Sequence, residues 1–287
     1  MNDRATTQDK EPVTPTLLRS WPLPEAGASK YDRGQVVVIG GSVRSPGAAM
    51  LSGIAALRMG AGRLTIAVDH AVAVDVAVAI PECGVVPLGD HSDLSEASPD
   101  IESADAILLG PGLDDAETAE GMLRALVHME ALSGVVVLDA YALGVAGQVP
   151  ELVESVGGRL ILTPNTHEAE RLLGRELSGN LPDDISELAH NFKAVVSCQG
   201  VVAHPNGALW TIGTGTAGLA TSGSGDVLAG AIAGLCARGA DPAQAAVWAT
   251  HAHAAAGDRL AVQVGPLGFL ASELLAELPR VLVEVGA

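Results

Sequence analysis

Short apolar strands alternate with helical segments along most of the chain, and no other feature limits the fold as strongly. Residues 35–41, 63–68 and 105–113 are rich in Val, Ile or Leu, and helical spacing of small apolar residues follows the first of them. Strands with such continuous apolar runs are buried on both faces, as in parallel sheets. We therefore predict an α/β fold with a mostly parallel central sheet and helices on both faces, a three-layer α/β/α architecture.

The first residues differ from the rest of the chain. Residues 1–16 are polar, contain prolines and lack the apolar core of a signal peptide. No stretch rich in Pro, Gly or Ser divides the chain after residue 30. We predict a flexible N-terminal leader over residues 1–30 and a single domain over residues 31–287.

Charge and cysteine content exclude several kinds of partner. With 34 acidic and 16 basic residues the net charge is −18, which argues against nucleic acid because phosphate contacts need clustered Lys and Arg. No uninterrupted apolar run reaches the ~18 residues of a membrane span, so we expect no membrane partner. Cys83, Cys198 and Cys236 are far apart and in no metal-binding spacing. Reduced thiols of this kind indicate a cytoplasmic protein.

Glycine or polar residues follow five of the expected strands, at residues 40–42, 110–112, 139–140, 163–168 and 221–226. In a sheet of this kind ligands bind at the carboxyl ends of the strands. We expect these five segments to converge on one edge of the sheet. The segment at 40–47 matches neither the GxxxxGK[ST] nor the GxGxxG phosphate loop, and a tight strand-to-helix turn is an equal interpretation of its glycines.

The segment TSGSGD, residues 221–226, places Asp226 where a glycine-rich loop becomes a helix. Gly223, Ser224 and Gly225 can bring backbone N–H groups close to a phosphoryl group at the helix start. Asp226 would then act as a general base that takes a proton from a substrate hydroxyl. The alternative is a carboxylate that only stabilises the first helical turn, by roughly 0.3–1 kcal/mol.

The segment TPNTHE, residues 163–168, gives a second polar cluster. Asn165 and Glu168 are three residues apart at an expected helix start, so a capping interaction is one interpretation. The other is that Glu168 holds water on Mg²⁺ near a phosphate. We assign no metal site to His167, His251 or His253, because their spacing does not suit a metal and such residues more often pack or lie at the surface.

These motifs together resemble the ADP-dependent NAD(P)H-hydrate dehydratases of the ribokinase-like superfamily, over roughly residue 31 to the C-terminus. The resemblance rests on VVVIGGSVRSPGAAMLSGIAALRMGAGRLTIAV, LLGPGL, VVLDAYAL, GLATSGSGDVLAGAIAGL and AAGDRLAVQVGPLGFLASELLAELP. It implies a repair enzyme that consumes ADP to remove water from hydrated NADH or NADPH. The expected products are the intact dinucleotide, AMP and phosphate.

The resemblance also implies roles for individual residues. Ala48, Gly112 and Asp226 match substrate contacts of the family, and Asn165 stands where the family usually has a substrate-contacting His. Gly225 matches a nucleotide contact, and Gln199 and Gly200 lie in the stretch that corresponds to the family's KGAxT segment. Relatives often form homotetramers, so we expect a homo-oligomer.

Three residues depart from the usual family pattern: Asn165 for His, Tyr141 for Asp and Val196 for the Lys of KGAxT. A missing cation should weaken ADP binding unless Gln199 or an Arg replaces it. Two alternatives stay open. One is a kinase of vitamin precursors that uses ATP and Mg²⁺, and the other is a catalytically weak nucleotide-binding relative. The sequence leaves the choice between NADH and NADPH hydrate open as well.

Overall fold

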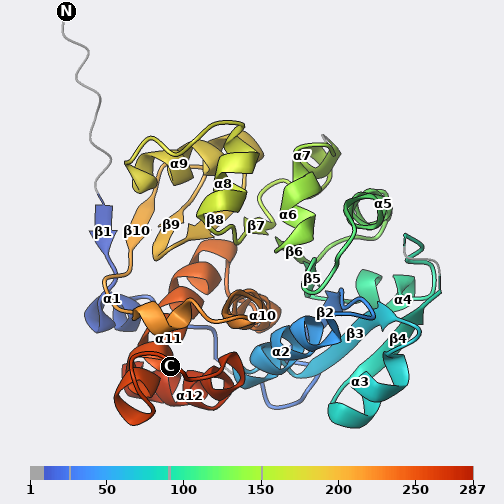
Figure 1. Ribbon diagram of the computed structural model, residues 1–287, viewed down its shortest axis with the longest axis horizontal. Helices are drawn as coiled ribbons and strands as arrows, with labels where there is room; N and C mark the ends of the chain where they lie inside the picture. The colour runs from blue at the N-terminus through green and yellow to red at the C-terminus, as the bar shows by residue number, and fades with distance from the viewer. Residues whose placement is uncertain (1–9, 26, 90–91, 150, 287) are drawn as a thin grey trace, which may run out of the picture.

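The structure, a computed structural model, describes residues 10–25, 27–89, 92–149 and 151–286. Within these ranges the strands are β1 (Lys10–Pro12), β2 (Gln35–Ile39), β3 (Arg63–Asp69), β4 (Gly84–Leu88), β5 (Ala106–Leu109), β6 (Val135–Leu138), β7 (Leu160–Leu162), β8 (Val195–Cys198), β9 (Val201–Ala203) and β10 (Leu209–Thr211). They form one sheet in the order β1-β10-β9-β8-β7-β6-β5-β2-β3-β4 (Figure 1).

Every neighbouring pair from β8 across to β4 is parallel. The chain then turns back at Gln199 and Gly200, so β9 runs antiparallel to β8, and β10 antiparallel to β9. The prediction of a mostly parallel sheet is confirmed. All carboxyl ends of the parallel strands therefore meet at one edge.

Helices cover both faces of the sheet. They are α1 (Pro15–Ser20), α2 (Pro46–Arg58), α3 (Ala73–Ala79), α4 (Ser98–Glu102), α5 (Ala116–Val127), α6 (Tyr141–Ala146), α7 (Glu151–Ser155), α8 (Thr166–Leu173), α9 (Leu181–Phe192), α10 (Ser224–Ala237), α11 (Pro242–Gln263) and α12 (Ala271–Val285), with a 3₁₀ turn, η1 (Ala217–Leu219). Within the described ranges, none of these helices has both the length and the apolar character needed to cross a membrane.

The two faces of the sheet bury different side chains, as alternation along β2 shows. Val36 and Val38 pack in the core that contains α2, α10, α11 and α12, whereas Val37 and Ile39 pack in the core that contains α5, α6 and α9. Figure 1 shows these two groups of helices on opposite sides of the sheet. The three-layer α/β/α architecture is thus confirmed.

The predicted flexible leader is wrong for the part of it that the structure describes. β1 pairs in parallel with β10, and Leu18 in α1 is completely buried. The few apolar residues of this polar segment are the ones that dock, and short-range patterns could not reveal their distant partners. Residues 1–9 lie outside the described residues.

The three tryptophans of the chain fasten this N-terminal segment. The rings of Trp21 and Trp210 stack with their centroids 5.6 Å apart, and the indole N–H of the buried Trp248 donates to the backbone oxygen of Trp21 over 2.9 Å. Gln244 donates to the same oxygen and to that of Pro22. Segments from β10, α11 and the N-terminus are thereby joined at one corner.

Candidate active site

The loops that follow β2 and β5 are joined to each other. The N–H of Gly41 donates to the oxygen of Pro111 over 2.8 Å. Gly112 has a φ of 73°, and a Cβ at this position would lie 2.3 Å from the backbone oxygen of Ser45 and 3.1 Å from the Cβ of Ala48. Only glycine suits such a backbone and such an approach. The structure thus brings Ala48, in the first turn of α2, against Gly112 in the loop after β5, and both are predicted substrate contacts.

The TSGSGD loop meets the same region from the other side of α2. Gly223 is in the left-handed conformation, with a φ of 89°, and caps α10. A Cβ on Gly223 would approach Leu51 of α2 to 2.6 Å. The hydroxyl of Ser52 lies 3.0 Å from the backbone oxygens of both Asp226 and Ala48. One hydroxyl thus contacts the backbone of both Asp226 and Ala48, which places the start of α10 beside the first turn of α2.

Small residues let α2 and α10 approach closely. A Cβ on Gly230 would lie 2.1 Å from the oxygen of Ser52, and one on Gly234 would lie 2.5 Å from the oxygen of Ala56. Backbone packs directly on backbone here, so neither helix can shift without the other. This contact holds α10 in a defined place relative to α2, which carries Ala48, a predicted substrate contact.

Three carboxylates gather at this edge of the sheet. Burial first, and then the charge of Glu168, raise the pKa of Asp226 to about 6. Burial and the charge of Asp226 are the main causes that raise the pKa of Asp139 to about 7, although Thr163 donates to its Oδ1 over 2.9 Å. Burial also raises the pKa of Glu168. Each carboxylate is therefore easier to protonate than an ordinary one.

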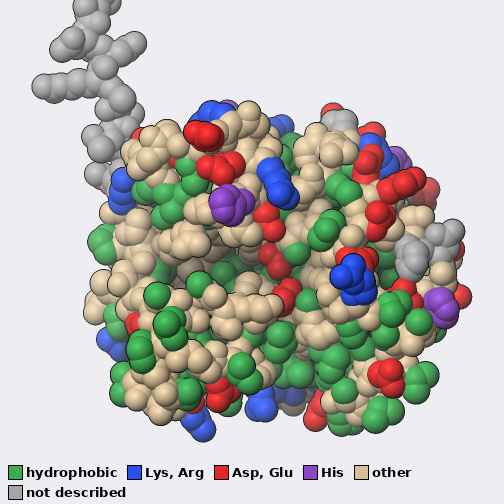
Figure 2. All heavy atoms as spheres, in the orientation of Figure 1, with side chains coloured by type: hydrophobic (Ala, Val, Ile, Leu, Met, Phe, Trp, Pro, Cys, Tyr) green, Lys and Arg blue, Asp and Glu red, His purple; other side chains and the backbone are tan. Residues whose placement is uncertain are grey.

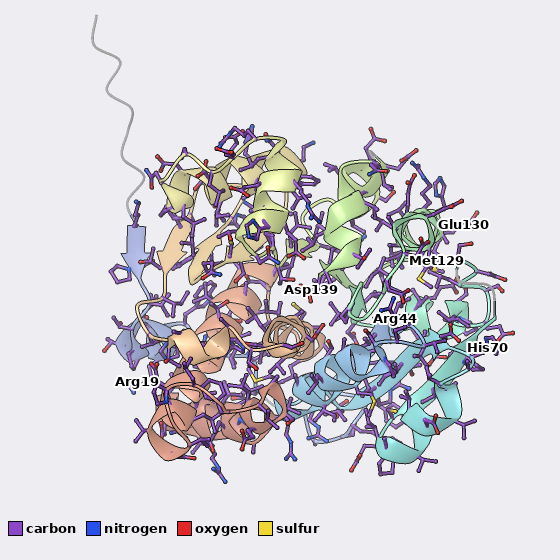
Figure 3. The ribbon with its side chains drawn as sticks, viewed as in Figure 1. Arg19, Arg44, His70, Met129, Glu130 and Asp139 are labelled. Carbon is purple, nitrogen blue, oxygen red and sulfur yellow. The ribbon has the colours of Figure 1, made fainter. Side chains whose placement is uncertain are left out.

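The surroundings of this carboxylate group are open to a ligand. Asp139 lies near the middle of the face in Figure 3. The same face in Figure 2 is hollowed beside a line of acidic side chains. Clefts that hold groups with shifted pKa values are candidate functional sites. Asp139 was not among our predicted site residues, although the segments at 139–140 and 221–226 were expected to converge on this edge.

Asn165 and Glu168 form the capping box that was one of the two interpretations. The Oδ1 of Asn165 accepts from the N–H of Glu168 over 3.0 Å, and Glu168 Oε2 accepts from the N–H of Asn165 over 2.9 Å. This pair begins α8 and fixes the Glu168 side chain near the other carboxylates. Substrate contact by Asn165 stays a prediction.

His253 supports the TSGSGD loop from α11. Its Nε2 lies 2.9 Å from Ser224 Oγ and 3.0 Å from the backbone oxygen of Ser224. Burial lowers the pKa of His253 to about 4, so the ring is neutral at pH 7. His251 is buried too, which agrees with the expectation that these histidines pack. The contact with Ser224 spans 29 residues, and nothing in the local sequence pointed to it.

The stretch compared with KGAxT runs through β8. Val196 is completely buried there, whereas Gln199 is exposed and has a φ of 48° at the turn into β9. Because β8 is parallel to β7, Gln199 and Gly200 emerge at the edge that carries the carboxylates. Their contact with a nucleotide stays a prediction. Tyr141, at the start of α6, is exposed.

The residues present suit Mg²⁺ held through water better than a directly ligated metal. Among the residues that the structure describes, no three His, Cys, Asp or Glu side chains form a metal-binding group. The charge of Glu168 nevertheless raises the pKa values of Asp139 and Asp226, and the charge of Asp226 raises that of Asp139, so these carboxylates repel one another. A hydrated divalent cation would relieve that repulsion, and Mg²⁺ commonly keeps several of its waters.

Comparison with known proteins places the chain in a family. A family model described as NAD(P)H-hydrate dehydratase matches residues 36–280. An ADP-dependent (S)-NAD(P)H-hydrate dehydratase from Xanthomonas campestris is 40% identical over 94% of this chain and 95% of its own length.

Solved structures agree with this result. The Bacillus subtilis ADP/ATP-dependent NAD(P)H-hydrate dehydratase, co-crystallised with ATP and Mg²⁺, is 28% identical with a TM-score of 0.79, covering 97% of this chain and 100% of its own. A ribokinase-like superfamily protein from Enterococcus faecalis shares the fold, with a TM-score of 0.86 at 23% identity over 99% of both chains. The chain belongs to the NAD(P)H-hydrate dehydratase family and has the ribokinase-like fold.

Proposed function

We propose that this protein is an ADP-dependent (S)-NAD(P)H-hydrate dehydratase, which repairs hydrated NADH or NADPH and releases AMP and phosphate. The observation that carries the proposal is the place of Asp226. It lies in the first turn of α10, behind a left-handed glycine, and Ser52 Oγ is 3.0 Å from both its backbone oxygen and that of Ala48, which lies against Gly112. Relatives with this name support the assignment.

Two half-reactions follow from this arrangement. In the first, the ring hydroxyl of the hydrate attacks the β-phosphorus of ADP, its proton passes to Asp226, and AMP leaves. In the second, the new C–O bond to phosphate breaks and the neighbouring ring carbon loses a proton, which restores the double bond. Water thus leaves in the form of phosphate, and the sum balances as hydrate plus ADP giving NAD(P)H, AMP and phosphate.

Each part of the loop has a role in this chemistry. Backbone N–H groups of Gly223, Ser224 and Gly225 would face the transferring phosphoryl group at the helix start, where the dipole favours negative charge. Gln199 and Gly200 would contact the nucleotide from the β8–β9 turn. A base with a pKa of about 6 is ionised at pH 7 and still accepts a proton readily. His253 would act through Ser224 as a positioning residue.

Mg²⁺ would enter with the nucleotide and be held through water by Glu168 and Asp139. When bound, it supplies positive charge beside the phosphates. Asn165 would line the substrate side of the same edge. ADP rather than ATP as the phosphoryl donor is part of the proposal, supported by the Xanthomonas campestris relative.

The deciding experiment mixes the purified protein with hydrated NADH and either ADP or ATP, and follows the absorbance of the reduced nicotinamide. Recovery with ADP, with one AMP and one phosphate formed per dinucleotide, is the expected result. Recovery only with ATP would mean that ATP, rather than ADP, is the phosphoryl donor. Folded protein that restores nothing with either nucleotide argues against the function. Phosphorylation of a vitamin precursor instead would favour a kinase.

The pH dependence tests the role of Asp226 as a base. Since the base must be ionised, kcat/KM is expected to fall about tenfold per pH unit below about pH 6. Glu168→Gln removes a charge that raises the pKa of Asp226, so this acid limb should move to lower pH. The exposed Glu176→Gln serves as the control. If the acid limb of the kcat/KM profile stays at the same pH in Glu168→Gln, the charge of Glu168 does not raise the pKa of Asp226.

We also propose a cytoplasmic homo-oligomer. Free Cys83, Cys198 and Cys236 support a reducing compartment. Exposed apolar side chains near the end of the chain support a subunit contact, namely Val262, Val264, Leu267, Leu270 and Val283. The molar mass in solution checks the expected tetramer.

A further inference from the structure

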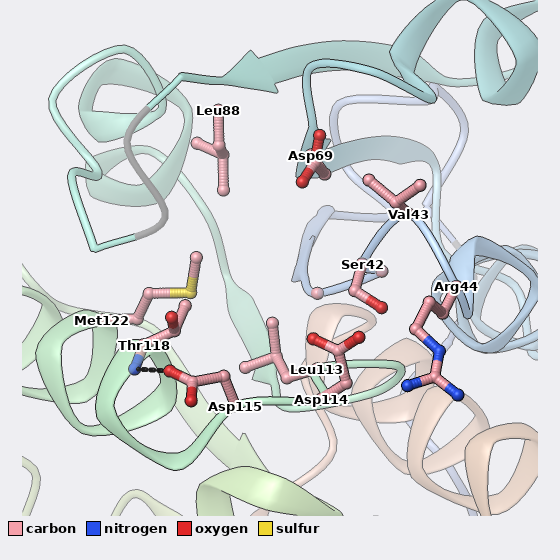
Figure 4. Close-up of a pocket in the computed structure, with 12 residues that line it drawn as sticks. Ser42, Val43, Arg44, Asp69, Leu88, Leu113, Asp114, Asp115, Thr118 and Met122 are labelled. Atoms are coloured by element: carbon pink, nitrogen blue, oxygen red, sulfur yellow. Dashed lines mark hydrogen bonds between the residues drawn. The ribbon is translucent and has the colours of Figure 1, made fainter.

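A cavity of about 440 Å³ lies beyond the carboxyl ends of β2 to β5, and the proposed chemistry leaves it unused. Its lining includes Gly41, Arg44 and Asp69 on one side and the residues that open α5 on the other (Figure 4). Such a volume falls within the range of small-molecule sites. Gly41 also lies against Gly112, so the cavity borders the proposed substrate contacts.

The substrate needs a place for the half that does not react. Its nicotinamide end must reach Asp226, and the phosphates of ADP would occupy the loop and the β8–β9 turn on the far side of Asp226. The adenosine end of the dinucleotide must therefore extend the opposite way, past Ala48 toward β2 and β3. This cavity lies in that direction. Leu88, Leu113 and Met122 give it an apolar wall suited to a base.

The local topology matches a nucleoside site as well. β2, a glycine-containing loop, α2 and β3 make a βαβ unit, and Asp69 is the last residue of β3. In dinucleotide-binding βαβ units an acidic residue at this point accepts hydrogen bonds from the ribose hydroxyls. The side chain of Asp69 is only 5% exposed, and its Oδ1 accepts from the N–H of Ala71 over 2.8 Å. A carboxylate can accept about four hydrogen bonds, so a ribose hydroxyl can be added to those already made.

The charges of the lining oppose a further phosphate. Among the described residues of the lining, Arg44 is a cation, and Asp69, Asp114 and Asp115 are anions. His70 lies 3.5 Å from Asp69 with its side chain 64% exposed. The 2′-phosphate of NADPH adds nearly two negative charges at neutral pH. It would also replace the ribose hydroxyl that donates a hydrogen bond to Asp69. In Figure 4 the Arg44 guanidinium extends away from Asp69.

From these observations we infer that this cavity holds the adenosine half of the substrate and that Asp69 makes NADH hydrate the preferred substrate over NADPH hydrate. The inference rests on the proposed function for the identity of the dinucleotide. The expected preference in kcat/KM is about tenfold to a hundredfold, the range of a hydrogen bond to a charged group.

The test measures kcat/KM for both hydrates with ADP, in the unaltered protein and in Asp69→Asn. Asn keeps an acceptor for Ala71 and removes the charge, so the NADH-over-NADPH preference should fall at least fivefold, mainly through KM. Asp75→Asn, an exposed change in α3, should leave the preference unchanged. Asp114 is also exposed, and Asp114→Lys should lower the preference for NADH hydrate by adding a cation to the cavity. This variant tests the inference even if Asp69→Asn fails to fold.

Equal use of both hydrates by the unaltered protein, or a preference that neither variant changes, overturns the inference while leaving the dehydratase intact. If neither hydrate is turned over, the proposed function fails instead. In that case the inference is tested without turnover, by measuring the equilibrium binding of NADH and of NADPH through nicotinamide fluorescence. Tighter binding of NADH that Asp69→Asn abolishes supports it, and equal binding overturns it.

Discussion

Asp226→Asn is expected to lower kcat by about 10²–10⁴-fold, the usual contribution of a general base. Asparagine keeps the shape of the side chain but cannot accept the proton of the substrate hydroxyl. Hydrate repair with saturating ADP measures the effect. KM should change little, because the backbone groups that would hold the phosphoryl group stay in place.

The same variant separates a catalytic role from a structural one through its stability. The pKa of Asp226 is raised from 3.8 to about 6, so its ionised form costs folding free energy above about pH 6. Asp226→Asn removes that cost and should unfold at the same or a higher urea concentration at pH 8, with a gain in unfolding free energy of at most about 3 kcal/mol. The gain should shrink toward pH 4.

Asp183→Asn is the matched control, because Asp183 is an exposed acidic residue in the first turn of α9. It should retain full activity and lose up to about 1 kcal/mol of helix stabilisation. If Asp226→Asn behaved in the same way, Asp226 would only stabilise its helix.

Gly230→Ala is expected to destabilise the protein by about 3 kcal/mol, near the upper end for overpacking in a core. The new Cβ would lie 2.1 Å from the backbone oxygen of Ser52, and no flexible side chain there can move aside. Helices α2 and α10 must separate instead, so Asp226 would also move relative to Ala48. Urea unfolding and the repair assay measure the two effects.

Gly144→Ala provides the comparison, since Gly144 is an exposed glycine in α6 with nothing within 4 Å of its added Cβ. Alanine there should leave stability unchanged or raise it by up to about 1 kcal/mol. Equal behaviour of the two variants would show that α2 and α10 are not held by backbone contact.

Local sequence patterns were sufficient for the layers and for many helix starts. The continuous apolar run of β2 predicted a strand buried on both faces. Asp241 followed by Pro242 is such a local helix-start pattern, and at the start of α11 Asp241 accepts from two N–H groups at 3.0 Å. Such features depend on neighbouring residues, which the sequence displays directly.

Contacts between distant residues could not be predicted in the same way. The sequence placed the segments that carry Asp139 and Asp226 at one edge, but it did not show that the two carboxylates interact. The contact of His253 with Ser224 likewise forms only after the helices have packed. The docking of residues 10–25 has the same cause, because Trp21 finds its partners in β10 and α11. The capping box of Asn165 and Glu168 is different, because it depends on two residues only three positions apart. Capping was one of the two interpretations of this sequence pattern, and the structure confirms it.

The gathering of all three tryptophans at the N-terminal corner has a practical consequence. Intrinsic fluorescence of this protein, excited at indole wavelengths, reports almost entirely on whether residues 10–25 are seated against β10 and α11. A shift in indole emission during unfolding therefore times the release of this segment. Comparing the emission change with far-ultraviolet circular dichroism, which follows the secondary structure, shows whether residues 10–25 detach before the sheet unfolds or together with it.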